Sequence, residues 1–353
     1  IPIDYDVKNQ NSMKTINADQ IPQIKLANGD FIPAIGMGTF GNDKYTPEEV
    51  STAVYNAIKT GYRFFDGAAA YGNEQDIGNV YSRAINEGIV KRKDLYILSK
   101  VWNDMHGKGD VLVAVSKTLK DLQLDYLDAY LVHWPFPNDH APGAGVNDWN
   151  PNARPFFIEE FMETWKQMER LADMGLVRHI GVSNMTIPKL DEMLPLCRIM
   201  PAFNEIEIHP AFQQWEMFEY CRSKGIVPIA YSPLGSAERP KRDTEAGDTA
   251  VMEMPELVKI GKNHGIHPAL VCIKWAVQRG HIPVPFSVKQ TEYCSNLAAV
   301  TEDPLTDEEM EIIRQADRND RLIKGKVFLW PGAESWKNIW DLNNEIDRTG
   351  WTL

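Results

Sequence analysis

Short apolar runs alternate with longer amphipathic segments along most of the chain, and this alternation restricts the fold more than any other sequence feature. Runs rich in valine, isoleucine and aromatic residues are typical of strands buried on both faces. Between them, apolar stripes with helical spacing begin at Val50, Val111 and Phe161. Strand and helix alternate about eight times between residues 35 and 318, which predicts a parallel sheet. The predicted strands lie at 63–66, 95–99, 127–132, 177–182, 202–206, 226–230 and 282–285, preceded by one that leads into Gly36.

Capping signals mark the ends of several predicted helices. Residues 46–49 (TPEE) and 306–309 (TDEE) place a threonine before the helix and a glutamate at its third position, which predicts two capping boxes. Glycines suited to helix ends follow the amphipathic segments at Gly61, Gly88, Gly175 and Gly225.

Two folds contain a parallel sheet of this kind. A closed (β/α)8 TIM barrel needs about 250 residues, which matches the observed span. An open doubly wound sheet is the alternative, and it carries a Gly-x-Gly-x-x-Gly turn at the start of a helix. Residues 36–41 have these letters, but 42–45 delay the next helix. We therefore read residues 36–41 as a loop on a barrel rim and predict the barrel.

The barrel is expected to span residues 22–325, between a polar N-terminal extension (1–21) and a C-terminal flap (326–353). Asn28-Gly29 predicts a two-residue hairpin turn with both residues at positive φ, and this hairpin would cap the N-terminal end of the barrel. Polar stretches at 138–155 and 236–250 follow strand ends, on the face where barrel enzymes place their chemistry. The tryptophan-rich flap is expected to cover the same face.

Composition excludes several classes of partner. The formal net charge is −12, and an acidic surface does not attract nucleic acid or anionic membranes. No apolar stretch approaches the ~18 residues of a membrane span. The four cysteines are far apart and form no Cys-x-x-Cys pair, as expected of reduced thiols in the cytoplasm. We predict a cytoplasmic protein that acts on a small molecule, with its oligomeric state open.

Four polar side chains converge at the ends of neighbouring predicted strands. Asp66, Lys100 and His133 end the second, third and fourth strands, and Tyr71 follows Asp66 by five residues. Adjacent strands are about 4.8 Å apart, so Asp66 and Lys100 should face each other, and a buried lysine needs such a partner. The Lys100 ammonium is expected to lower the pKa of Tyr71 and make it a proton donor near neutral pH. Singly, each residue also fits a structural role, such as a core ion pair or packing.

Five motifs resemble, in order, the signatures of the aldo-keto reductases (aldose and xylose reductases among them). They are Asp66–Glu74 (DGAAAYGNE), Leu98–Trp102 (LSKVW), Leu131–Pro135 (LVHWP), Ile180–Asn184 (IGVSN) and Ala230–Gly235 (AYSPLG). The resemblance covers about residues 22–325 and implies a (β/α)8 barrel. It also implies a nicotinamide cofactor, no metal, and hydride transfer to an aldehyde or ketone.

The same resemblance implies a role for each matching residue. Tyr71 would be the general acid, tuned by Lys100 and Asp66, and His133 would orient the carbonyl. The substrate pocket would comprise Phe40, Trp102, His133 and Trp134, with Phe40 standing where many relatives have tryptophan.

The implied cofactor site extends across the same rim. Tyr231 would stack on the nicotinamide, and Ser183, Asn184 and Glu205 would hold its carboxamide. The remaining implied cofactor residues are Gly38, Thr39 and Asp66 near the first strands, Ser232, Leu234, Ser236 and the latch Glu238 on the pyrophosphate loop, and Ser287, Val288, Lys289, Glu292 and Asn296 at the adenosine end.

Two departures from the family pattern concern the cofactor. Phe286 and Glu292 replace the lysine and arginine that relatives place around an adenosine 2′-phosphate. A carboxylate ~4 Å from a phosphate repels the phosphate by a few kcal/mol, whereas a carboxylate accepts hydrogen bonds from ribose hydroxyls. NAD(H) is therefore favoured over NADP(H), although Lys289 is close enough in sequence to meet a 2′-phosphate. Glu205 replaces a common glutamine. Ionised, it would favour the cationic ring of the oxidised cofactor and alcohol oxidation; protonated, it would act as glutamine does.

Other functions fit parts of this pattern. A cofactor-sensing regulatory subunit with little turnover would keep the same residues. A metal-dependent barrel hydrolase lacks ligands, because only Asp66 and His133 qualify and Lys100 would repel a cation. The substrate stays open among sugars, steroids and simple aldehydes.

Overall fold

The computed structural model describes residues 15–41, 44–137, 139–141 and 143–352. Most of the predicted N-terminal extension, residues 1–14, lies outside the described residues. Within them, no helix is long and apolar enough to cross a bilayer.

Eight parallel strands follow one another around the sheet in chain order. The two edge strands meet, since the amides of Gly36 and Gly38 donate to the carbonyls of Pro283 and Pro285 over 3.1 Å each. The sheet is thus a closed barrel, and the open doubly wound alternative is wrong. The strands are β3 (Met37–Gly38), β4 (Phe64–Asp66), β5 (Tyr96–Val101), β6 (Leu127–Val132), β7 (Val177–Ser183), β8 (Phe203–Glu207), β9 (Val227–Tyr231) and β10 (Ile282–Pro283).

The glycines of residues 36–41 serve barrel packing. A Cβ on Gly36 would lie 2.2 Å from the ring of Phe64, and one on Gly38 would lie 2.9 Å from the carbonyl oxygen of Val284. No side chain fits at either position without movement of the neighbouring strands. Residues 36–41 do not open a helix, as predicted, but the prediction of a rim loop is wrong for Met37–Gly38, which form the first barrel strand, β3.

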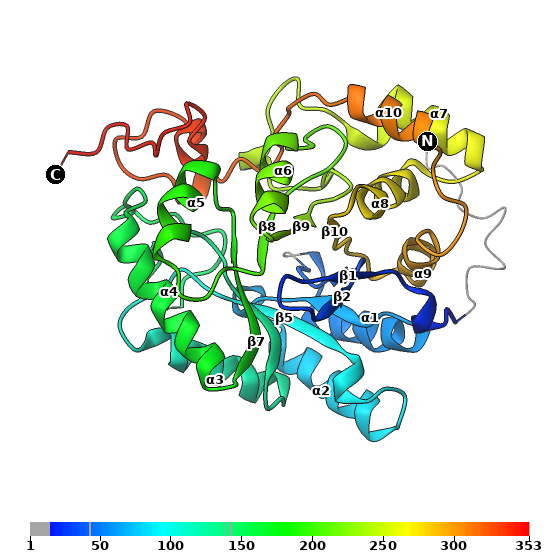
Figure 1. The fold of residues 1–353 in the computed structure, drawn as a ribbon, viewed down its shortest axis with the longest axis horizontal. Helices are drawn as coiled ribbons and strands as arrows, with labels where there is room; N and C mark the ends of the chain where they lie inside the picture. Colours follow the sequence, from blue (N-terminus) through cyan, green and yellow to red (C-terminus); the bar gives the residue numbers. More distant parts are fainter. Residues whose placement is uncertain (1–14, 42–43, 138, 142, 353) are drawn as a thin grey trace.

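Helices surround the strands, as Figure 1 shows. The predicted box at Thr306 is complete, because Thr306 and Glu309 each accept the other's backbone N–H. At Thr46 only the threonine side of the box forms. The helices are α1 (Pro47–Thr60), α2 (Glu74–Asn86), α3 (Asp110–Leu122), α4 (Ile158–Asp173), α5 (Ile187–Met193), α6 (Trp215–Ser223), α7 (Pro255–His264), α8 (Pro268–Arg279), α9 (Gln290–Ala298) and α10 (Asp307–Gln315).

The N-terminal hairpin pairs β1 (Gln23–Lys25) with β2 (Phe31–Pro33) and contributes Leu26 and Ile32 to the apolar cluster inside the barrel. Its turn differs from the prediction. The Leu26 amide donates to the Asp30 carbonyl, which leaves a three-residue loop in which only Gly29 has a positive φ, of 93°. The Asn28 side chain instead accepts the Asp30 amide, which holds Asn28 in an ordinary conformation.

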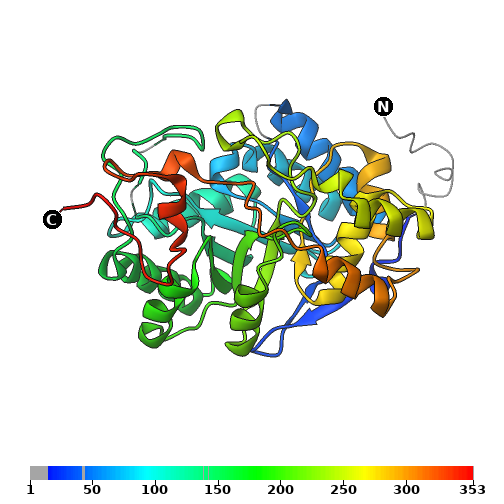
Figure 2. The ribbon, with the colours of Figure 1, turned by 90° about the horizontal axis from the view of Figure 1, so that it is seen from above.

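The C-terminal segment packs against the carboxyl ends of β6 to β8. The ring of Phe328 stacks on Trp134 with centroids 3.9 Å apart, and Asp341 forms an ion pair with Lys189 of α5 at 2.6 Å. Figures 1 and 2 both show this segment, orange to red, on the side of α4 and α5.

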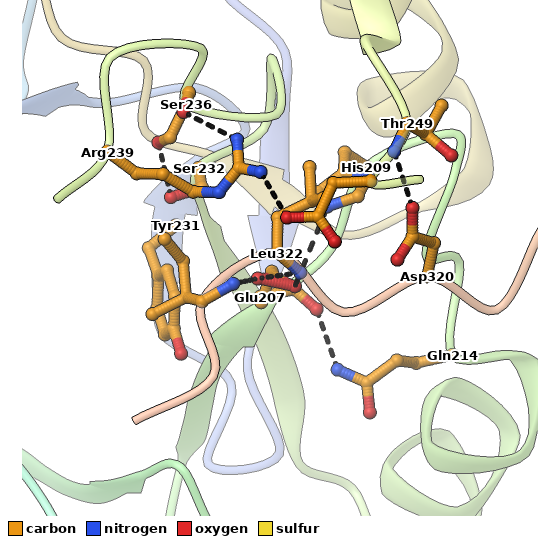
Figure 3. Close-up of polar contacts among 12 residues, drawn as sticks. Glu207, His209, Gln214, Tyr231, Ser232, Ser236, Arg239, Thr249, Asp320 and Leu322 are labelled. Carbon is orange, nitrogen blue, oxygen red and sulfur yellow. Dashed lines mark hydrogen bonds and ion pairs between the residues drawn. The ribbon is translucent and has the colours of Figure 1, made fainter. Parts of the chain in front are cut away.

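The residues just before this segment contact the end of β8 and the loop after β9. Glu207 accepts the Leu322 amide at 3.0 Å, and Asp320 accepts the Thr249 amide at 2.6 Å (Figure 3). The chain therefore reaches the C-terminal segment after crossing the rim of the barrel.

Candidate active site

Lys100 stands at the centre of the polar cluster that the strand ends create. Its ammonium lies 2.9 Å from Asp66 Oδ1, 2.9 Å from the Gly67 carbonyl and 3.4 Å from Tyr71 Oη. The side chain is only 1% exposed, and Asp66 is equally enclosed. The structure brings together the residues that the spacing of strands β4 and β5 placed side by side.

A short helical turn carries Tyr71 back over the barrel. The chain leaves β4 at Asp66, forms the 3-10 turn Ala69–Tyr71, and ends that turn at Gly72 with φ of 67°. Such a positive φ suits glycine, which has no Cβ to clash. This local geometry aims the phenol at the end of β5.

The pKa of Tyr71 contradicts the expectation of a tyrosine acidified toward neutral pH. Burial raises its pKa, and Lys100 reverses only part of that rise. The ammonium is offset by two carboxylates, Asp66 and Glu205, which also raise the pKa of Lys100 against the effect of its burial. At neutral pH Tyr71 is therefore a protonated phenol beside a permanent cation. A proton donor needs that form.

Glu205 is the unexpected member of the cluster. Its Oε1 lies 3.5 Å from the Lys100 ammonium, while its Oε2 is buried and receives no hydrogen bond from the described residues. Burial first, and then Asp66, raise the pKa of Glu205 well above its usual range. The sequence marked Glu205 as a departure from the family pattern but did not predict its contact with Lys100.

His133 is a neutral imidazole. Burial, with a contribution from Lys100, holds its pKa well below the usual range. Its ring lies edge-on to Tyr71 at 5.8 Å and to Trp102 at 5.2 Å between centroids. A neutral histidine donates one hydrogen bond, which is enough to orient a carbonyl oxygen near the phenol.

Aromatic rings form the walls beside these polar groups. Phe40 lies 4.9 Å from Tyr71 between ring centroids, and Trp102 packs at 4.9 Å from His140. Trp134 is covered by Phe328. Phe40, Trp102 and Trp134 were predicted from the sequence. His140 and Phe328 were not, because neither belongs to a periodic segment or follows a predicted strand end.

Side chains of β7 and β9 complete one edge of the rim. Tyr231 Oη donates to Asn184 Oδ1 at 2.6 Å, and the Asn184 amide group donates to the His133 carbonyl at 3.0 Å. Ser183 Oγ donates to the Glu205 carbonyl at 2.8 Å. These bonds join the residues predicted to hold a nicotinamide into one rigid group.

The loop after β9, predicted to meet the pyrophosphate, turns sharply at two serines. Ser232 and Ser236 both have positive φ, 49° and 45°, and their hydroxyls are 2.7 Å apart (Figure 3). Arg239, which the sequence analysis missed, donates to the Ser236 carbonyl and forms an ion pair with Asp248 at 2.6 Å. Leu234 is half-buried on this loop. Glu238 pairs with Lys44, which joins the loops after β9 and β3.

The predicted adenosine end centres on Glu292. It accepts the Ser287 hydroxyl at 2.6 Å and lies 3.5 Å from the Lys289 ammonium. Asn296 is buried beside this group, and Val288 is half-buried. Thr39, next to Gly38 at the end of the adjacent strand β3, donates to the Asp66 carbonyl at 2.8 Å.

These residues fit a nicotinamide dinucleotide. Glu205 Oε2 accepts no hydrogen bond, and Asn184 Oδ1 has a second lone pair, so both can accept from a carboxamide. No groups of three or more His, Cys, Asp or Glu suited to a metal ion occur in the part of the chain that the structure describes.

Comparisons with known proteins identify the family of this chain. The model described as "Aldo/keto reductase family" matches residues 34–318. The chain is 40% identical over 317 residues to an aldo/keto reductase of Synechocystis sp., covering 90% of this chain and 95% of that one. It is 40% identical over 307 residues to the NAD(P)H-dependent D-xylose reductase of Pachysolen tannophilus, covering 84% and 93%. The crystal structure of a Bombyx mori aldo-keto reductase in complex with NADP matches with a TM-score of 0.75 and 32% identity, covering 86% and 95%.

Proposed function

This chain belongs to the aldo/keto reductase family and is an NAD(P)H-dependent oxidoreductase, and we propose that it reduces an aldehyde or ketone to the alcohol with Tyr71 as general acid. The supporting observation is the Lys100 ammonium, which lies 2.9 Å from Asp66 and 3.4 Å from the Tyr71 hydroxyl inside a buried site.

The bound cofactor supplies the hydride. Tyr71 gives its proton to the carbonyl oxygen as negative charge develops there, and Lys100 stabilises the phenolate that remains. Neutral His133 orients the oxygen toward the phenol. The aromatic walls exclude water, which strengthens each of these electrostatic interactions.

We further propose that NADH serves this chain at least as well as NADPH. Glu292 already contacts both Ser287 and Lys289, so the charge of the Lys289 ammonium is partly neutralised. A 2′-phosphate would meet that carboxylate, and Phe286 adds no charge to offset it. Measurement of kcat/KM with each cofactor tests this: a preference for NADPH above about tenfold, or 1.4 kcal/mol, refutes it.

Turnover tests the reaction itself. The assay follows consumption of NADH or NADPH over a panel of aldehydes, ketones, aldoses and, in reverse, alcohols. Tyr71→Phe keeps the ring but removes the proton, and we expect a loss of about 10²- to 10⁴-fold in kcat with cofactor binding retained. A wild-type chain that binds cofactor without turning over any carbonyl would favour a cofactor-sensing role. A Tyr71→Phe variant with wild-type kcat would refute the role of Tyr71.

A further inference from the structure

We propose that Glu205 makes this active site select the oxidation state of its cofactor: ionised Glu205 favours the oxidised form, whose ring is cationic, and protonated Glu205 does not. This inference rests on the proposed function, because it assumes a nicotinamide at the end of β8. In this proposal, Glu205 sets the charge of the site.

The position of Glu205 is fixed by the sheet. Strand β8 pairs Glu205 with Ser183 of β7, and the side chain is 2% exposed. One carboxyl oxygen lies 3.5 Å from the Lys100 ammonium, and the other is buried and accepts no hydrogen bond from the described residues. A buried acceptor without a donor is costly unless a ligand supplies one.

The charges around Glu205 do not cancel when it is ionised. The Lys100 ammonium lies between the carboxylates of Asp66 and Glu205, so the cluster carries a net charge of about −1 with Glu205 ionised and about zero with it protonated. A glutamine in place of Glu205 would leave only the Lys100–Asp66 pair, whose charges cancel near neutral pH. The glutamate therefore adds a charge that can be switched by protonation.

The other titratable groups facing Glu205 contribute no charge near neutral pH. Tyr71 and Tyr231 both have pKa values raised by burial, so both are neutral phenols. Burial holds the nearby His133 neutral as well. Ser183 at the end of β7 and Asn184 just after it carry no charge. Glu205 is thus the group whose ionisation changes the local charge.

Ionisation of Glu205 occurs at higher pH than that of an ordinary glutamate, because burial and Asp66 raise its pKa. By linkage, a ligand that prefers the ionised carboxylate must lower that pKa and release a proton when it binds. The cationic ring of NAD+ has this preference, and the neutral ring of NADH has none. The two forms should therefore differ in the protons that they release.

Calorimetric titration of the whole chain with NAD+ and with NADH, in buffers of different ionisation enthalpy, measures this release. We expect NAD+ binding to release a fraction of a proton and NADH binding to release less. In Glu205→Gln the release with NAD+ should disappear, and the Kd for NAD+ should rise about tenfold relative to that for NADH. In Tyr71→Phe the release should persist, which excludes the phenol as its source.

A matched control removes a different buried carboxylate. Glu74→Gln alters a glutamate that accepts the hydroxyls of Ser99 and Thr118 behind β5, and it should leave the NAD+ to NADH ratio of Kd values unchanged. Equal weakening of both forms in Glu205→Gln, or release that persists in that variant, overturns the proposal. A folded wild-type chain that binds neither NAD(H) nor NADP(H) overturns the proposed function instead.

Discussion

Replacing Lys100 by methionine removes the ammonium on which the whole polar cluster depends. The ammonium lies 3.4 Å from the Tyr71 hydroxyl, and at an effective dielectric near 20 a unit charge at that distance stabilises a phenolate by about 5 kcal/mol. The two carboxylates oppose part of this effect. We therefore expect kcat for carbonyl reduction to fall about 10²- to 10³-fold.

The same substitution leaves Asp66 and Glu205 buried without a cation. Loss of one partner of a buried ion pair costs about 3–5 kcal/mol of stability, and less at low pH, where the carboxyls can protonate. Thermal unfolding across pH should therefore show the largest drop in Tm for Lys100→Met at high pH. Lys100→Arg keeps the positive charge and serves as the control for a substitution at this buried position.

Single-turnover reduction with saturating cofactor separates the chemical step from binding. The reasoning is refuted if Lys100→Met remains folded, as judged by circular dichroism, yet reduces its substrate within about tenfold of the wild-type rate.

Three other variants probe the rest of the molecule. The hydrogen bonds of His264 to Glu309 and Asp303 raise the pKa of His264. The stabilisation from His264 is therefore complete below its unfolded pKa of about 6.5 and is lost as the pH rises through its folded pKa. His264→Gln should lower Tm more at about pH 5 than at about pH 9, and an equal loss at both would contradict this. Phe328→Ala removes the ring whose centroid lies 3.9 Å from that of Trp134. It should reduce the free energy of unfolding by about 3 kcal/mol and raise KM for carbonyl substrates. An unchanged KM would show that Phe328 does not shape the pocket. Gly36→Ala would place a Cβ 2.2 Å from the Phe64 ring and should destabilise the barrel by about 1–3 kcal/mol in chemical denaturation. Gly145→Ala is the matched control, because neither glycine has a positive φ and a Cβ on Gly145 would meet only Asp148, at 3.6 Å; equal losses in the two variants would remove the argument from close packing.

The sequence alone determined the strand and helix pattern and the residues that meet at the strand ends. Alternating apolar runs depend on local spacing, and parallel neighbours bring the ends of β4 and β5 together, so Asp66, Lys100 and Tyr71 were predictable as a group. The sequence also showed that residues 36–41 do not open a helix, because residues 42–45 separate them from the start of α1.

Only the tertiary structure decided the electrostatics and the contacts between distant segments. The direction of the Tyr71 pKa depends on how completely the phenol is buried and on how many carboxylates share Lys100. Glu205 of β8 contacts Lys100, and Phe328 of the C-terminal segment contacts Trp134. Both contacts join residues far apart in the sequence, so no local sequence pattern predicts them. Desolvation and long-range packing are properties of the closed barrel, because they depend on which side chains exclude water from one another after the strands have met.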